Sequence, residues 1–303
     1  MQDLTWEKVI SHCGLKNDRD ISHLAKVVTY ARKQGIGQPI SFQKTGYTDS
    51  DLNIIKIILH QWMFVCRNTK MELLSDVEIK SLINLLIKSV RSQEHLDVVA
   101  IFCPSYKKGV GCYGYNQQIG KNTVKQLNSL SGFINAAKAV SFKLNCHVYF
   151  CDLILENFFR LIDNDEYERD LECNFNSFRE RALTLMPTAN IEKLSSFGYL
   201  NESLGPYGIA RLVNESSKNI YKQVFLRNKA FYKTCFNWSD EEIRERTLIL
   251  MGSYALMGNF FKERFPLGLM FWTESMYERA AMYSLDTGVD TFPIIFPESD
   301  VIN

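Results

Sequence analysis

The sequence has almost no charge imbalance and no long apolar run. Its 35 lysines and arginines stand against 34 aspartates and glutamates, a formal net charge of +1. Bulk charge therefore argues against a strongly basic nucleic-acid binder. No apolar run approaches the roughly 20 residues that a helix needs to span a bilayer. The first residues do not form a basic region followed by an apolar signal core. We expect a soluble, cytoplasmic protein with no membrane partner.

Several compact catalytic and binding motifs are also missing. The eight cysteines among 303 residues include no C-x-x-C pair, and the five histidines are scattered. This pattern favours reduced thiols over a metal site. No Walker loop occurs, and the absence of a G-x-S-x-G elbow disfavours a serine hydrolase. We expect neither a metal nor a cofactor.

Two short apolar runs, residues 98–102 and 146–150, end abruptly in polar residues. A helical stretch from about residue 120 to 142 separates them. Strand, helix and strand in this order form a βαβ unit, in which the two strands are parallel. Ligands bind beyond the carboxyl ends of such strands. Ser105, Tyr106 and Asp152 therefore mark the expected site.

The rest of the chain extends this pattern. Residues 1–95 are mostly helical, and helices are also predicted over residues 163–186 and 240–264, the latter with a capping box from Ser239 to Glu242. Two further strands are expected near residues 267–272 and 292–296, and prolines around the last favour a sheet edge. We predict an α/β protein with a helical N-terminal region, 1–95, and a Rossmann-like parallel sheet in a catalytic domain, 96–303.

The loop after the first strand carries Tyr106, Lys107, Lys108 and Gly109. Two lysines can hold a phosphate as point charges, and glycine lets the backbone approach a ligand closely. The same residues also suit an ordinary surface loop with solvated lysines. The position after a central strand makes phosphate binding a working hypothesis.

Carboxylates supply the other candidate chemistry. Asp152 and Glu156 share one face if a helix begins near residue 153, and neighbouring carboxylates can serve as acid and base or bind an amine. A capping aspartate and a solvated glutamate are the alternative. Glu274 and Ser275 follow the third strand and would join the same rim. Tyr254, on the preceding helix, faces the cleft or packs in the core.

Residues 218–233 interleave lysines and an arginine with tyrosines and phenylalanines. Such a mixture can bind RNA by charge and stacking. An amphipathic helix with lysines on its solvent face produces the same pattern. Both interpretations stay open at the level of sequence.

The order of segments resembles the isocyanide synthase family over roughly residues 98–297. The resemblance rests on the helix segment 126–134, the strand ending in Asp152, the downstream acidic helix at 163–171 and the closing pattern Pro293–Pro297. Cys151-Asp152-Leu153 stands where that family has serine-aspartate-glycine, and Trp272-Thr273-Glu274 replaces a histidine-containing strand end. The resemblance implies conversion of an amino acid's α-amine to an isonitrile, with a pentulose phosphate as carbon donor. Lys107 and Lys108 would bind that phosphate, and Asp152 would hold the amine or move its proton.

Two alternatives belong to other classes. Ser105 resembles the nucleophilic serine of the cyclodipeptide synthases, and Tyr254 resembles their tyrosine, although Gly258 replaces the glutamate expected four residues later. That resemblance implies aminoacyl transfer from charged tRNA, with residues 218–233 as the tRNA contact. The third alternative is a non-catalytic binding protein on the same fold.

Overall fold

A computed structural model describes residues 49–70, 76–105, 114–152, 165–197, 238–271 and 294–295, together with residues 222, 225–226, 229 and 233. Its helices are α3 (Asp49–Asn68), α4 (Asp76–Ser92), α5 (Lys121–Ala139), α7 (Asp165–Leu185) and α10 (Asp240–Arg264). Within these ranges no helix is both long and apolar enough to cross a membrane.

Within the described part of the chain the sheet has five strands, and every pair of neighbours is parallel. The strands are β1 (Leu96–Phe102), β2 (Leu144–Phe150), β3 (Asn190–Lys193), β4 (Gly268–Phe271) and β5 (Ile294–Ile295), in the spatial order β3-β2-β1-β4-β5. The predicted α/β class is confirmed, and β5 lies at the sheet edge as its flanking prolines indicated. All carboxyl ends of the strands therefore meet at one edge.

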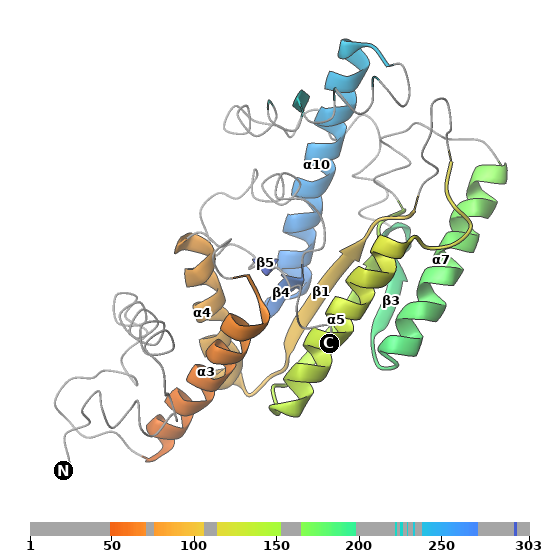
Figure 1. The fold of residues 1–303 in the computed structure, drawn as a ribbon. Coiled ribbons are helices and arrows are strands. Elements are labelled where there is room, and N and C mark those ends of the chain that lie inside the picture. The colour runs from red at the N-terminus through yellow and green to blue at the C-terminus, as the bar shows by residue number, and fades with distance from the viewer. Residues whose placement is uncertain are drawn as a thin grey trace.

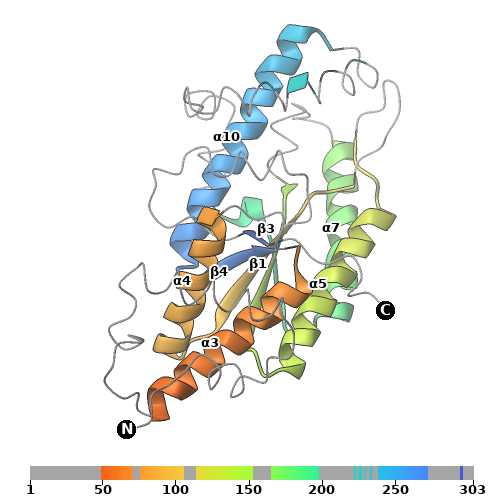
Figure 2. The ribbon, with the colours of Figure 1, turned by 60° about the vertical axis from the view of Figure 1, so that its left-hand side comes forward.

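Alternation along the strands divides the helices between two faces of the sheet. Tyr149 of β2 packs its ring 5.0 Å from that of Phe261 in α10. The next residue, Phe150, points to the opposite face, where its ring lies 5.3 Å from that of Phe178 in α7. Figures 1 and 2 show α5 and α7 side by side along that opposite face. The sheet is thus covered on both faces, as parallel sheets require.

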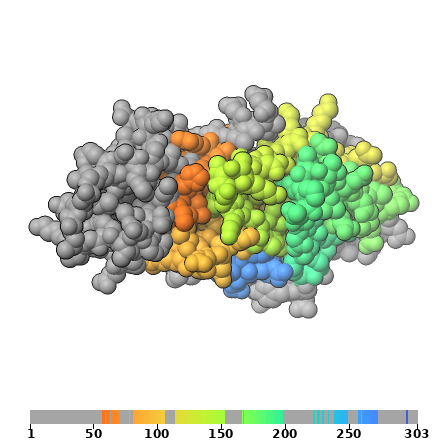
Figure 3. Space-filling view, turned by 90° about the horizontal axis from the view of Figure 1, so that it is seen from below, coloured from red at the N-terminus to blue at the C-terminus, as the bar shows by residue number. Residues whose placement is uncertain are grey.

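The helix α3 joins the α5 face of the sheet. Phe133 of α5 is 1% exposed, and its ring lies 5.2 Å from Phe64 of α3 and 5.6 Å from Phe271 of β4. Seen from below, α3, α5 and α7 form a row across the molecule (Figure 3). Phe133 therefore connects a helix, a crossover and a strand from three distant parts of the chain.

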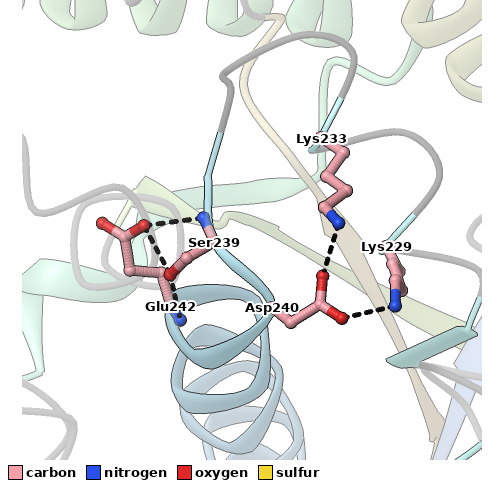
Figure 4. Close-up of polar contacts among 5 residues, drawn as sticks. All are labelled: Lys229, Lys233, Ser239, Asp240 and Glu242. Carbon is pink, nitrogen blue, oxygen red and sulfur yellow. Dashed lines mark hydrogen bonds and ion pairs between the residues drawn. The ribbon is translucent and has the colours of Figure 1, made fainter.

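The predicted capping box at the start of α10 is present. The Ser239 hydroxyl accepts a hydrogen bond from the backbone N–H of Glu242 at 3.2 Å, and the Glu242 carboxylate accepts one from the backbone N–H of Ser239 at 2.8 Å (Figure 4). Two N–H groups that the first turn leaves without intrahelical partners are thereby satisfied. The start of this long helix is fixed by local sequence alone.

The amino edge of the sheet carries its own polar contact. His147 Nε2 lies 3.0 Å from an Asp97 carboxylate oxygen on the neighbouring strand, and the centroid of the imidazole ring lies 4.5 Å from that of Phe265, with the two rings tilted to each other. Burial raises the pKa of Asp97, but hydrogen bonds from His147 and Asn145 outweigh it, and the pKa is lowered overall. This contact ties β1 to β2 at the end remote from the expected site.

The order of the strands also locates a binding crevice. The chain passes from β1 outward to β2 and β3, then returns to the other side of β1 to form β4 and β5. Strand order therefore reverses between β1 and β4. In open parallel sheets ligands bind at the carboxyl side of such a reversal, which is where the chain leaves β1.

Replacing Phe133 with alanine tests this packing. The lost transfer energy and the cavity left beside α3 and β4 should lower the free energy of unfolding by about 3–5 kcal/mol, measured by urea denaturation. Leu183→Ala, on the exposed side of α7, is the control and should change it by less than about 0.5 kcal/mol. Similar effects for the two substitutions would contradict the described core.

Candidate functional site

The carboxyl edge brings together the chain segments that follow β1, β2 and β3. The backbone N–H of Cys151 donates to the carbonyl of Phe102 at 2.8 Å, so pairing of the chain continues past the last residues of β1 and β2. Ser105, Asp152 and Ser195 follow these three strands within three residues of their ends. Neighbouring parallel strands therefore place these three residues along one rim.

Most of the other predicted site residues lie outside the described residues: Tyr106, Lys107, Lys108, Gly109, Glu156, Glu274 and Ser275. Tyr254 lies within α10, and the structure describes its backbone only. The proposed convergence of Tyr106, Asp152 and Glu274 remains a prediction. Asp152 and Ser105 are the two predicted site residues whose side chains the structure describes.

Asp152 is a buried carboxylate held by one residue of the neighbouring segment. It is 4% exposed, and its two oxygens accept hydrogen bonds from the backbone N–H of Ser195 at 3.1 Å and from the Ser195 hydroxyl. Ser195 belongs to a single turn of 3-10 helix, η2 (Leu194–Ser196), directly after β3. Because the Ser195 hydroxyl and backbone N–H each donate a hydrogen bond to a different oxygen, the orientation of the Asp152 carboxyl group is fixed.

Burial raises the pKa of Asp152 above its usual value, and it outweighs the lowering effects of the Ser195 hydrogen bonds and of the Lys193 charge. A carboxyl group with a raised pKa exchanges its proton closer to neutral pH than an exposed aspartate does. In its ionised form a carboxylate is a suitable partner for an ammonium ion. Asp152 can therefore act as an acid, a base or an amine ligand at this rim.

Ser105 lies between the end of β1 and the start of α5. Its hydroxyl oxygen accepts a hydrogen bond from the backbone N–H of Gly120 at 2.8 Å and lies 3.4 Å from the Thr123 hydroxyl. The Ser105 backbone N–H donates to the side chain of Asn174 at 3.4 Å. None of these partners can remove a proton from the hydroxyl. Within the described residues, Ser105 joins the end of β1 to the start of α5, and its hydrogen-bond partners include no base.

Ser195 was not predicted as a site residue from the sequence. No strand was expected before it, because β3 is a four-residue segment, Asn190–Lys193, with no buried residue. The G-x-G-x-x-G spacing at Gly109, Gly111 and Gly114 was also missed. Gly114 has a φ of 128°, which favours glycine. However, α5 begins only at Lys121, whereas a dinucleotide fingerprint opens directly into its helix.

Two lysines of the basic segment 218–233 have an acidic partner. Lys229 and Lys233 both form ion pairs with Asp240, in the first turn of α10 (Figure 4). The two ammonium groups hold the pKa of Asp240 at about 2. One carboxylate therefore offsets part of the positive charge of these two lysines within the protein, whereas in a nucleic-acid contact phosphate would be their partner.

Comparison with known proteins gives a likeness of fold. No protein-family model matches the sequence, and no curated protein sequence matches it. The solved structure of the PvcA protein from Pseudomonas aeruginosa superposes with a TM-score of 0.52 at 9% sequence identity, over 81% of this chain and 93% of that one. At this level of identity the likeness shows a similar fold, and it assigns neither a family nor a reaction to this chain.

Ser195→Ala tests the described environment of Asp152. The hydroxyl stabilises the ionised carboxylate, so its removal should raise the pKa of Asp152 further. A carbon-13 NMR titration of the carboxyl carbon measures this pKa. Ser196→Ala is the matched control, because the Ser196 hydroxyl donates to the Lys193 carbonyl at 2.6 Å and not to Asp152. An unchanged pKa in Ser195→Ala would contradict the contact.

The same group makes stability depend on pH. Asp152 binds its proton more tightly in the folded than in the unfolded protein. The free energy of unfolding should therefore be highest at low pH with respect to this group, and fall as the pH rises from the unfolded-state pKa through the folded-state pKa. Asp152→Asn should remove this part of the pH dependence in denaturant titrations. A free energy of unfolding that rises with pH over this range would show that burial does not dominate the pKa of Asp152.

Proposed function

We propose that this protein is an isocyanide-synthase-like enzyme that converts an amino acid's α-amine to an isonitrile, with a pentulose phosphate supplying the carbon. The observation that carries the proposal is Asp152, a buried carboxyl group with a raised pKa at the carboxyl edge of the sheet. Its fold is similar to that of PvcA. The sequence resemblance to isocyanide synthases places the same aspartate in the family's site.

In this proposal each substrate has its own place on the rim. Asp152 binds the α-ammonium group and accepts a proton from it, since only the neutral amine is a nucleophile. The amine nitrogen then attacks the carbonyl carbon of the pentulose phosphate and forms an imine: a C=N bond replaces the C=O bond, and the oxygen leaves as water. Both C–C bonds of this carbon must then break, so that the carbon stays on nitrogen as the isonitrile and the rest of the sugar leaves as two fragments. Lys107 and Lys108, in the connection between β1 and α5, bind the phosphate. Glu156, Glu274, Tyr106, Gly109, Tyr254 and Ser275 are proposed to complete the site.

Two observations favour this reaction over aminoacyl transfer from tRNA. The described partners of Ser105 include no base that would activate it as a nucleophile. Lys229 and Lys233 are already paired with Asp240. Both observations argue against the cyclodipeptide synthase alternative, the first against Ser105 as its nucleophile and the second against residues 218–233 as its tRNA contact.

The test is incubation of the protein with ribulose 5-phosphate and each of the twenty amino acids. We expect an isonitrile infrared band with at least one amino acid. Asp152→Asn should reduce its rate of formation by about 10²–10⁴-fold, because the base is lost. Asp97→Asn is the matched control, since this carboxylate lies at the opposite edge of the sheet.

The outcomes separate the three hypotheses. Silence with all twenty amino acids would contradict the proposed reaction. Transfer of a labelled aminoacyl group from charged tRNA to Ser105 would support the cyclodipeptide alternative. Absence of both, together with ligand binding, would support a non-catalytic protein.

A further inference from the structure

One face of α7 carries a row of polar residues turned toward the connection between β1 and α5. Asp170, Asn174 and Ser177 are spaced at four and three residues, so they share one side of the helix. Asp170 accepts a hydrogen bond from the Gln117 side chain at 2.8 Å, and the Ser177 hydroxyl accepts one from the backbone N–H of Ile119 at 3.4 Å. The helix α7, which lies between β2 and β3 in the chain, thus binds residues 117 and 119, which lead into α5.

Asn174 is the centre of this row. It is fully buried, and its side-chain amide donates to the carbonyls of Asn116 at 2.7 Å and Gln118 at 3.1 Å. Its side-chain oxygen accepts from the backbone N–H of Ser105 at 3.4 Å. The orientation of the amide is unambiguous, because two carbonyl partners require the nitrogen on their side. One side chain therefore binds the chain at residue 105, after β1, and at residues 116 and 118, before α5.

Further contacts close the same connection at its base. The backbone N–H of Asn116 donates to the carbonyl of Ser105 at 2.8 Å, and that of Gly120 donates to the Ser105 hydroxyl at 2.8 Å. A Cβ atom at Gly120 would lie 3.3 Å from this hydroxyl oxygen, which explains why glycine suits the position. Residues 105 and 116 are thereby joined directly.

From these contacts we infer that Asn174 is a positioning residue for ligand binding, because it fixes the chain before and after the part of the β1–α5 connection that carries Lys107 and Lys108. The inference rests on the proposed function, in which these lysines bind the phosphate of the pentulose. Fixing the residues on both sides of these lysines in the unbound protein reduces the conformational entropy that ligand binding must remove. Asn174 therefore acts on phosphate binding without touching the phosphate.

Asn174→Ala removes three hydrogen bonds at once, and Asn176→Ala, two residues along on the exposed side of α7, is the matched control. In Asn174→Ala we expect the KM for ribulose 5-phosphate to rise about tenfold, the effect of losing about 1.4 kcal/mol of binding, while the KM for the amino acid stays within twofold. A merely destabilised protein would not separate the two constants in this way. Equal changes in both, or none, would overturn the inference.

Limited trypsin digestion gives a second readout that needs no activity. Cleavage after Lys107 or Lys108, located by mass spectrometry, should be faster in Asn174→Ala than in the wild type and in Asn176→Ala. If Asn174→Ala does not fold, as judged by circular dichroism, Gln117→Ala tests the same row from its exposed side, and cleavage should again be faster. Unchanged cleavage in a folded variant would overturn the inference.

The two readouts distinguish this inference from the proposed function. Faster cleavage in the variants, with an inactive wild type, would support the restraint by Asn174 and refute the proposed reaction. An active wild type whose variants keep their KM for ribulose 5-phosphate would refute the positioning role and leave the reaction standing.

Discussion

The parallel pairing of β1 with both β2 and β4 is the constraint on which the rest of the structure depends. β1 lies in the middle of the sheet and pairs with β2 along its whole length, from Leu96↔Leu144 to Phe102↔Phe150. Because every neighbouring pair is parallel, each connection must cross a face of the sheet. The crossovers put α5 and α7 on one face and α10 on the other. The same rule brings Ser105, Asp152 and Ser195 to one edge.

Two aspartates at opposite edges of the sheet show how the environment decides the chemistry of one residue type. Asp97 receives hydrogen bonds from His147 and Asn145, and its pKa is lowered although burial works against it. Asp152 receives hydrogen bonds from the hydroxyl and the backbone of Ser195, and burial keeps its pKa raised. The first is a structural contact between strands in its ionised form. The second retains a proton more readily, which suits proton transfer.

Much of the fold was predictable because it depends on local patterns. The apolar runs of β1 and β2, the helical periodicity of α5 and α7 and the capping box of α10 are all signals within a few residues. β3 was not predictable, because its four residues are partly exposed and carry no apolar run. The contacts of the site were also hidden. Ser195 lies 43 positions from Asp152, and Asn174 lies 69 positions from Ser105, so only the crossovers bring them together.

The central claim is that the carboxyl edge of the sheet binds both substrates. A crystal structure of the protein with ribulose 5-phosphate and its amino acid tests this most directly. The account predicts the phosphate against the connection between β1 and α5 and the amine within hydrogen-bond distance of Asp152. Ligand found instead at the amino edge beside Asp97 and His147, or an empty carboxyl edge at saturating ligand, would contradict it.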